Sequence, residues 1–156
     1  MSTKKGNRKR ASAPGTPVWF TEKAWLKYFF DGARFPLRGE EYQCELYGTI
    51  DERGIVVHEV LEHSTRPAMR RAIIADLRRR HLVLLGESRK LATDFCTPQR
   101  RSHPYVFLLA RRLDGHTTIA CASVQDSRVI THPMHVLRDA AGSAPARLAT
   151  FKRRSR

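Results

Sequence analysis

The distribution of charge confines folding to the middle of this chain. The first sixteen and the last ten residues hold ten of the 29 basic residues and no acidic residue. Both ends also contain few large apolar residues, so we expect them to be disordered. We therefore predict a basic tail at residues 1–17, a single globular domain at residues 18–142 and a second basic tail at residues 143–156.

Two segments show the periodicity of amphipathic helices. The first follows Thr21, a plausible N-cap, and carries apolar residues four apart until the segment ends near Gly32. The second has a proline, Pro67, in its first turn after a cap at Ser64 or Thr65. A short closing helix is expected over residues 134–141.

Several segments are typical of strands. Residues 42–63 alternate in polarity around a turn at residues 51–54 and predict a β-hairpin, in which Gly48 marks a bulge or a close backbone approach. Further strands are expected over residues 81–86, 105–110, 117–124 and 128–131. The order α-β-β-α-β-β-β(-α) predicts a mixed α/β domain, with a mostly antiparallel sheet of about five strands packed by two main helices.

The basic residues predict a polyanionic partner. The net charge is +14, and flexible cations bind nucleic acids by releasing the counterions of the phosphates. The second helix adds an arginine-rich segment, and arginine forms bidentate contacts with phosphate. The predicted nucleic-acid contacts are Lys4, Lys5, Arg8, Lys9, Arg10, Arg70, Arg71, Arg78, Arg79, Arg80, Arg100, Arg101, Lys152, Arg153 and Arg154. The sequence leaves open whether the partner is DNA or RNA.

Other classes of protein receive less support. The longest apolar run, residues 105–110, is too short to span a membrane, and no secretory signal is apparent, so we expect a cytoplasmic protein associated with the nucleoid or with ribonucleoprotein. Three widely spaced cysteines suggest no disulfide framework and no zinc site. The segment His58–His63 lacks the histidine spacing of a zinc protease. We predict no cofactor and no metal.

Two alternatives to nucleic-acid binding stay open. A metal-independent ribonuclease needs only a base, an acid and a phosphate clamp. The side chains that could supply them are His103, His116, His132 and His135, with Arg100, Arg101 or Arg128. The other alternative is a protein-interaction module, in which the tails merely aid solubility.

The residues around Glu45 carry a resemblance to a known family. Glu45-Leu46-Tyr47-Gly48, followed by Ser102-His103-Pro104 and by Asp114, resembles the motifs of MPN/JAMM (JAB) domains. Arg101 stands where that family has its first metal-binding histidine, and Arg111 stands where it has a serine. The resemblance implies a catalytically degenerate domain that binds proteins, with Glu45, His103 and Asp114 as the remnants of a catalytic site.

Overall fold

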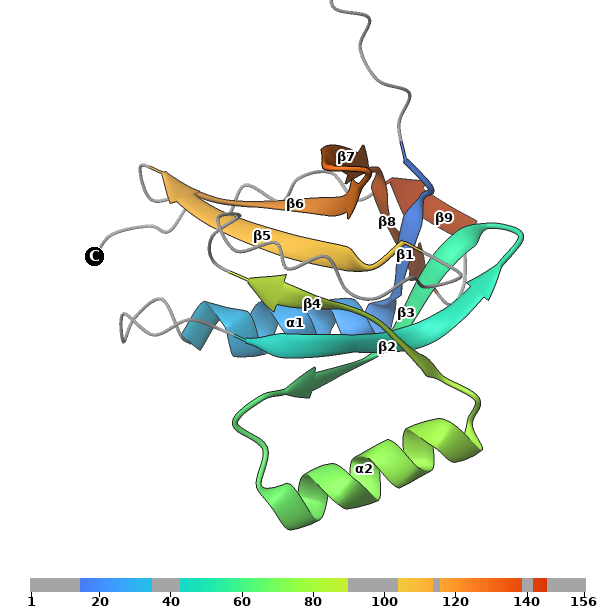
Figure 1. Ribbon diagram of the computed structural model, residues 1–156. Helices are drawn as coiled ribbons and strands as arrows, with labels where there is room; N and C mark the ends of the chain where they lie inside the picture. Colours follow the sequence, from blue (N-terminus) through green and yellow to red (C-terminus); the bar gives the residue numbers. More distant parts are fainter. Residues whose placement is uncertain (1–14, 35–42, 90–103, 114–115, 139–141, 146–156) are drawn as a thin grey trace, which may run out of the picture.

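A sheet of nine strands dominates the described part of the protein (Figure 1). The computed structural model describes residues 15–34, 43–89, 104–113, 116–138 and 142–145. The strands are β1 (Val18–Thr21), β2 (Cys44–Asp51), β3 (Gly54–Glu62), β4 (Val83–Arg89), β5 (Val106–Leu113), β6 (His116–Gln125), β7 (Arg128–His132), β8 (Met134–Arg138) and β9 (Gly142–Pro145). The helices of this described part are α1 (Glu22–Arg34) and α2 (Pro67–Arg79).

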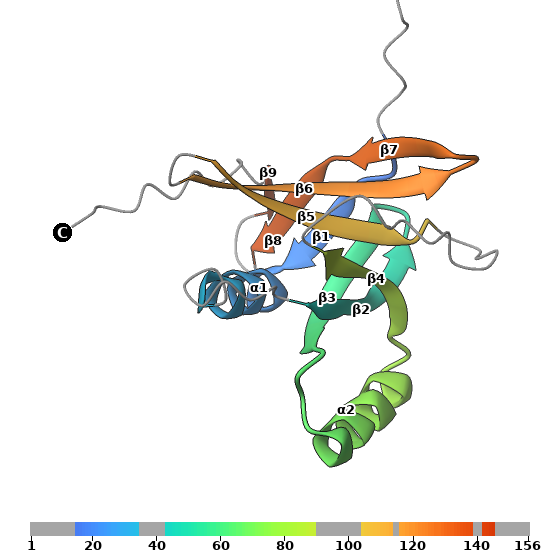
Figure 2. The ribbon, with the colours of Figure 1, turned by 60° about the vertical axis from the view of Figure 1, so that its left-hand side comes forward.

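The sheet is mixed and curls strongly, as Figure 2 shows. Its strand order is β7-β6-β5-β4-β2-β3-β1-β8-β9. Three pairings, β1–β3, β1–β8 and β4–β5, are parallel, and the others are antiparallel. The two flanks of the sheet meet because only Pro133 separates β7 from β8, and the Gly15 N–H donates to the carbonyl oxygen of Thr131 at 2.9 Å.

The predicted hairpin is confirmed. Strands β2 and β3 pair antiparallel from Asp51↔Gly54 to Cys44↔Glu62. Their register shifts at Gly48, where a Cβ atom would lie 1.8 Å from the carbonyl oxygen of Val56. Gly48 therefore marks both the bulge and the close backbone approach that the sequence suggested.

Helix α1 packs against the concave face of the sheet and completes the core. The Thr21 hydroxyl accepts a hydrogen bond from the Ala24 N–H at 3.2 Å, which confirms the predicted N-cap. Ala24 and Tyr28 are buried among strand residues. The Tyr28 hydroxyl lies 3.2 Å from the Ser88 hydroxyl, and burial raises its pKa. This hydrogen bond supplies the polar partner that a buried phenol requires.

A buried histidine ties the beginning of the described chain to the sheet. His132 is 3% exposed, and its Nε2 lies 2.7 Å from the hydroxyl of Ser123. Its Nδ1 lies 2.7 Å from the carbonyl oxygen of Thr16, which can only accept, so Nδ1 carries the proton. Nε2 shares a hydrogen bond with the Ser123 hydroxyl. Both ring nitrogens are satisfied inside the protein, so His132 holds the flanks of the sheet together.

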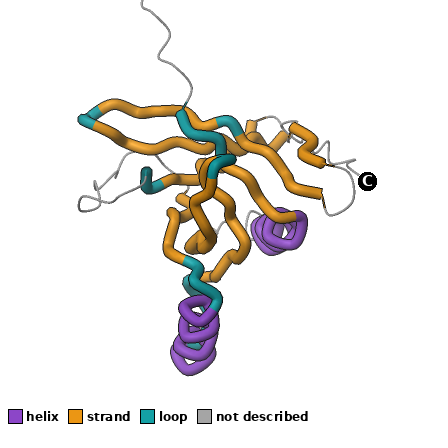
Figure 3. Tube along the Cα trace, turned by 90° about the vertical axis from the view of Figure 1, so that its right-hand side faces the viewer, coloured by secondary structure: helices purple, strands orange, loops and turns teal. Residues whose placement is uncertain are grey.

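Helix α2 stands apart from the sheet, to which short segments connect it at both ends (Figure 3). Pro67 occupies the first turn as predicted, since proline needs no hydrogen-bond acceptor there. The predicted cap at Ser64 or Thr65 is wrong, because the N-cap residue is Arg66, whose side chain makes no capping hydrogen bond. Within α2 only Leu77 is buried. The apolar contact between the helix and the sheet is therefore small, and polar contacts also hold the helix.

The predicted fold class is wrong in two respects. The protein is mostly sheet, and the sheet is a mixed, curled half-barrel rather than about five mainly antiparallel strands. The two helices also do not pack the sheet equally, because α1 fills its concave side while α2 stands off the opposite side. The additional strands β1, β8 and β9 are short. β1 pairs with two segments far away in the sequence, β3 and β8, whereas β9 pairs with the neighbouring β8.

The predicted closing helix over residues 134–141 is also wrong. Residues Met134–Arg138 form strand β8, which pairs with β1 in parallel. Their alternation places Met134 against the core, and the next residue, His135, on the other face. Pairing with β1 and burial on one face override the modest helical preference of this segment.

Candidate nucleic-acid interface

The arginines of α2 divide into two groups with different surroundings. Arg70 and Arg80 reach toward the sheet and pair with its carboxylates. Arg71 and Arg78 are exposed, and no carboxylate of the described residues lies within ion-pair distance of either. They are seven residues apart, which places them on the same side of the helix two turns from each other. One side of α2 is thus neutralised and the other remains cationic.

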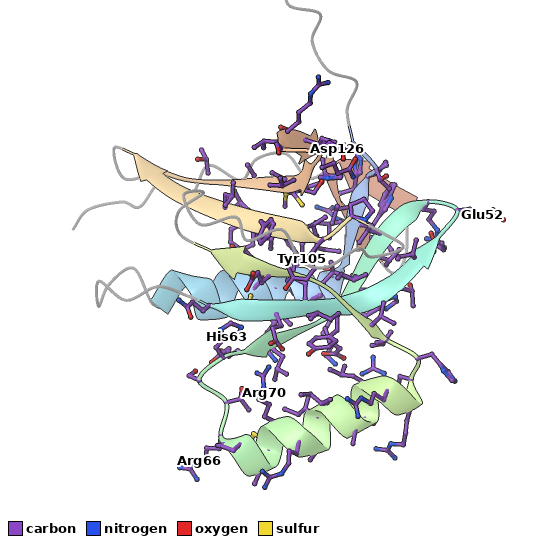
Figure 4. All side chains as sticks on the ribbon, viewed as in Figure 1. Glu52, His63, Arg66, Arg70, Tyr105 and Asp126 are labelled. Atoms are coloured by element: carbon purple, nitrogen blue, oxygen red, sulfur yellow. The ribbon has the colours of Figure 1, made fainter. Side chains whose placement is uncertain are left out.

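The first anchor of α2 is the ion pair between Arg70 and Glu45. The Arg70 Nη2 donates to Glu45 Oε2, which also accepts from the Tyr47 hydroxyl at 2.8 Å. His63 Nε2 lies 3.8 Å from Glu45 Oε1. Figure 4 shows His63 and Arg70 between α2 and the sheet. Burial, the hydrogen bond to Glu45 and the charge of Glu45 raise the pKa of Tyr47 to about 12, so Tyr47 remains a donor at neutral pH.

The second anchor lies at the other end of α2. Arg80 Nη1 donates to Glu59 Oε1 at 2.9 Å, and Lys23 Nζ of α1 donates to the same oxygen at 3.2 Å. Burial opposes ionisation of Glu59, but these two hydrogen bonds outweigh it and lower the pKa of the carboxyl group. Arg80 also lies 3.6 Å from Asp76. The two anchors fix the direction in which the helix presents its outer side.

A groove of about 480 Å³ runs between α2, β3 and α1. Its apolar lining includes Leu61, Ile73 and Leu77, and its cationic lining includes Lys27 and Arg79. The Arg79 side chain is 77% exposed and pairs with Asp76 at 2.9 Å. An exposed pair of this kind contributes little stability, so Arg79 is free to exchange its partner for another anion.

Replacing Arg70 tests whether the first anchor holds α2. In Arg70→Ala, we expect amide hydrogen exchange in α2 to accelerate about tenfold while the strands exchange as before, because α2 loses an anchor without a change in the core. The adjacent variant Arg71→Ala removes the same charge from an unpaired position and should change exchange less than about twofold. Equal acceleration in both variants would show that the ion pair to Glu45 does not hold the helix.

The structure places part of the predicted contact set and leaves the rest untested. Arg70 and Arg80 serve as anchors, whereas Arg71, Arg78 and Arg79 face solvent. The remaining predicted residues lie outside the described residues, and they are Lys4, Lys5, Arg8, Lys9, Arg10, Arg100, Arg101, Lys152, Arg153 and Arg154, together with the catalytic candidates His103 and Asp114.

In the described part of the chain, the residues proposed for catalysis do not come together in one site. Glu45, the one described member of the JAMM-like set, is already bonded to Arg70 and Tyr47. Of the histidines considered for RNA cleavage, His132 is buried on Ser123, and His135 stacks on an indole ring. Among the described residues, no group of three or more His, Cys, Asp or Glu side chains is placed to hold a metal ion.

The partners of the anchors could be predicted only in part. Strand alternation places Glu45 and Tyr47 on one face of β2, and both indeed lie on the face opposite the core. The contacts of His63 and Lys23 were not predicted, because each joins segments more than fifteen residues apart. A search for acidic strand residues near an arginine-rich helix could have suggested that ion pairs form, but not which glutamate pairs with which arginine.

Comparisons with known proteins assign no family. No protein-family model matches the chain, and no curated protein matches it. The JAMM resemblance therefore remains a prediction. Within the described residues, neither helix is long and apolar enough to cross a lipid bilayer.

Proposed function

We propose that this protein binds the phosphate backbone of nucleic acids without sequence specificity, through the outer side of α2. The observation that carries the proposal is the separation of the arginines into anchored and unpaired groups. Arg70 and Arg80 form ion pairs with carboxylates of the sheet, whereas Arg71 and Arg78 are exposed and form no ion pair with a described residue. A helix that only needed solubility would not require this arrangement.

The geometry suits two neighbouring phosphates. Arg71 and Arg78 lie seven residues apart, or about 10 Å along the helix axis, on one side of α2. Arg79 adds a weakly paired guanidinium beside them. Because both ends of α2 are anchored, the helix direction is set before binding, which reduces the ordering that association requires. Contacts of this kind position the protein on the backbone and carry no base information.

The charge of the whole chain supports the same class of partner. A net charge of +14 on 156 residues attracts polyanions at long range and accelerates their encounter with the protein. The predicted tail contacts would add phosphates to those bound by α2. In a cell, such a protein would associate with the nucleoid or with ribonucleoprotein particles in the cytoplasm.

A salt series on the wild-type protein tests the proposal. Fluorescence anisotropy with labelled duplex DNA, duplex RNA and single strands should give log Kobs that falls with log salt, with a slope steeper than about −3 for duplex DNA. Several sequences of equal length should bind with similar affinity. An affinity that does not change with salt would contradict backbone binding, since release of counterions is unavoidable when phosphates are neutralised.

A further inference from the structure

The outer face of the sheet carries a stacked pair of rings on β1 and β8. Trp19 of β1 and His135 of β8 are register partners, and their ring centroids lie 4.4 Å apart with an interplanar angle of 29°. Val18 and Phe20, on either side of Trp19, are fully buried in the core. Strand alternation therefore turns the indole to the face opposite the core, where both rings remain partly exposed.

The indole ring is held in place by a polar contact as well as by stacking. Its Nε1–H donates to the carbonyl oxygen of Arg53, in the turn between β2 and β3, at 3.0 Å. The Arg53 side chain is 60% exposed and brings a cation to the same turn, where it lies 3.8 Å from Asp51 in an exposed, weak ion pair. A rigid, partly exposed ring pair next to a cation is the combination on which an unpaired nucleobase stacks.

The ring pair and the second anchor of α2 occupy the same face. Trp19 is the register partner of Val56 on β3, and Glu59, which holds Arg80, comes three residues later on that strand. Three residues of a strand span about 10 Å. His58 lies between Val56 and Glu59 on β3, and burial together with the charge of Arg80 lowers its pKa. A nucleic-acid strand whose phosphates are bound at the C-terminal end of α2 can thus reach the ring pair with one of its bases.

We infer that Trp19 and His135 form a stacking site for an unpaired base, so that the protein prefers single-stranded over duplex nucleic acid. This inference rests on the proposed backbone binding, to which it adds the class of substrate. Stacking on an aromatic ring tolerates every base, so the preference for single strands needs no sequence specificity. A duplex keeps its bases inside the helix and gains only the backbone contacts.

The test compares Trp19→Leu and Trp19→Phe with the wild-type protein on a single strand and on a duplex of equal length. We expect Trp19→Leu to weaken single-strand binding roughly tenfold and duplex binding less than twofold, whereas Trp19→Phe keeps most of the single-strand affinity. As a second readout, Trp25→Phe leaves Trp19 as the only tryptophan. Its fluorescence should be quenched by the single strand and not by the duplex.

The outcomes separate this inference from the proposed function. If Trp19→Leu binds single strands as the wild type does, or if Trp19 fluorescence does not respond, the stacking site is wrong. Backbone binding then still stands if Arg71→Gln/Arg78→Gln weakens both ligands. Should Trp19→Leu fail to fold by circular dichroism, Trp19→Phe and the quenching measurement decide the question.

Discussion

Leu46→Ala is expected to lower the free energy of unfolding by about 3–4 kcal/mol, a large share of the stability of a domain of this size. Leu46 is fully buried on the concave face of β2, where it belongs to the core that α1 completes. Truncation removes apolar contacts and leaves a cavity that the surrounding strands cannot close without losing register. Unfolding in guanidinium chloride measures the effect as a lower midpoint with an unchanged slope.

The matched control is Leu26→Ala on α1. Leu26 is 45% exposed, so the same chemical change there should cost less than about 1 kcal/mol, and the better helix propensity of alanine offsets part of it. A similar loss in both variants would mean that the core is not centred on the concave face of the sheet. The comparison thus tests the assignment of inner and outer faces, on which the interface depends.

Local signals predicted the elements whose partners are close in the chain. Thr21 and the apolar spacing after it located α1, and polarity alternation around residues 51–54 located the β2–β3 hairpin. Even the bulge at Gly48 could be anticipated, because glycine inside a strand usually marks a close backbone approach. In each case the structure is fixed by contacts within some twenty residues.

Non-local pairing explains what the sequence could not predict. β1 has only four residues and pairs in parallel with both β3 and β8, the latter more than a hundred residues away. No pattern within Val18–Thr21 or Met134–Arg138 encodes that pairing. The buried contact between His132 and Thr16 likewise joins the two ends of the fold. Such contacts decide the sheet topology, and a single sequence does not reveal them.

The candidate interface was predictable in composition but not in detail. The arginine-rich helix could be read directly from the sequence, whereas the division into anchors and unpaired cations could not. That division depends on where Glu45 and Glu59 emerge on the outer face, and the register shift that follows the Tyr47↔Glu59 pair sets the direction of Glu59. The stacked Trp19 and His135 pair depends on the unrecognised strand β8.

The second large effect is expected at the outer side of α2. In Arg71→Gln/Arg78→Gln, we expect affinity for duplex DNA at low salt to fall roughly thirtyfold, because two phosphate contacts are lost. Both side chains are exposed, so the free energy of unfolding should change by less than about 0.5 kcal/mol. Binding and unfolding measured on the same preparation separate loss of contact from loss of fold.

A control of equal charge is available on the far part of the sheet. Arg128 and Arg138 are exposed on β7 and β8, away from α2 (Figure 1). Arg128→Gln/Arg138→Gln lowers the net charge by the same amount, so it reports how much of the effect comes from long-range attraction alone. We expect this variant to lose less than about threefold in affinity.

The most direct measurement is the salt slope of duplex DNA binding for these two variants beside the wild type. Each lost phosphate contact reduces the magnitude of the slope by about 0.9. The slope of Arg71→Gln/Arg78→Gln should therefore be shallower than that of the wild type by about 1.8, and the slope of Arg128→Gln/Arg138→Gln should equal that of the wild type. The same slope in both variants would contradict the account, because the phosphates would then be bound somewhere other than α2.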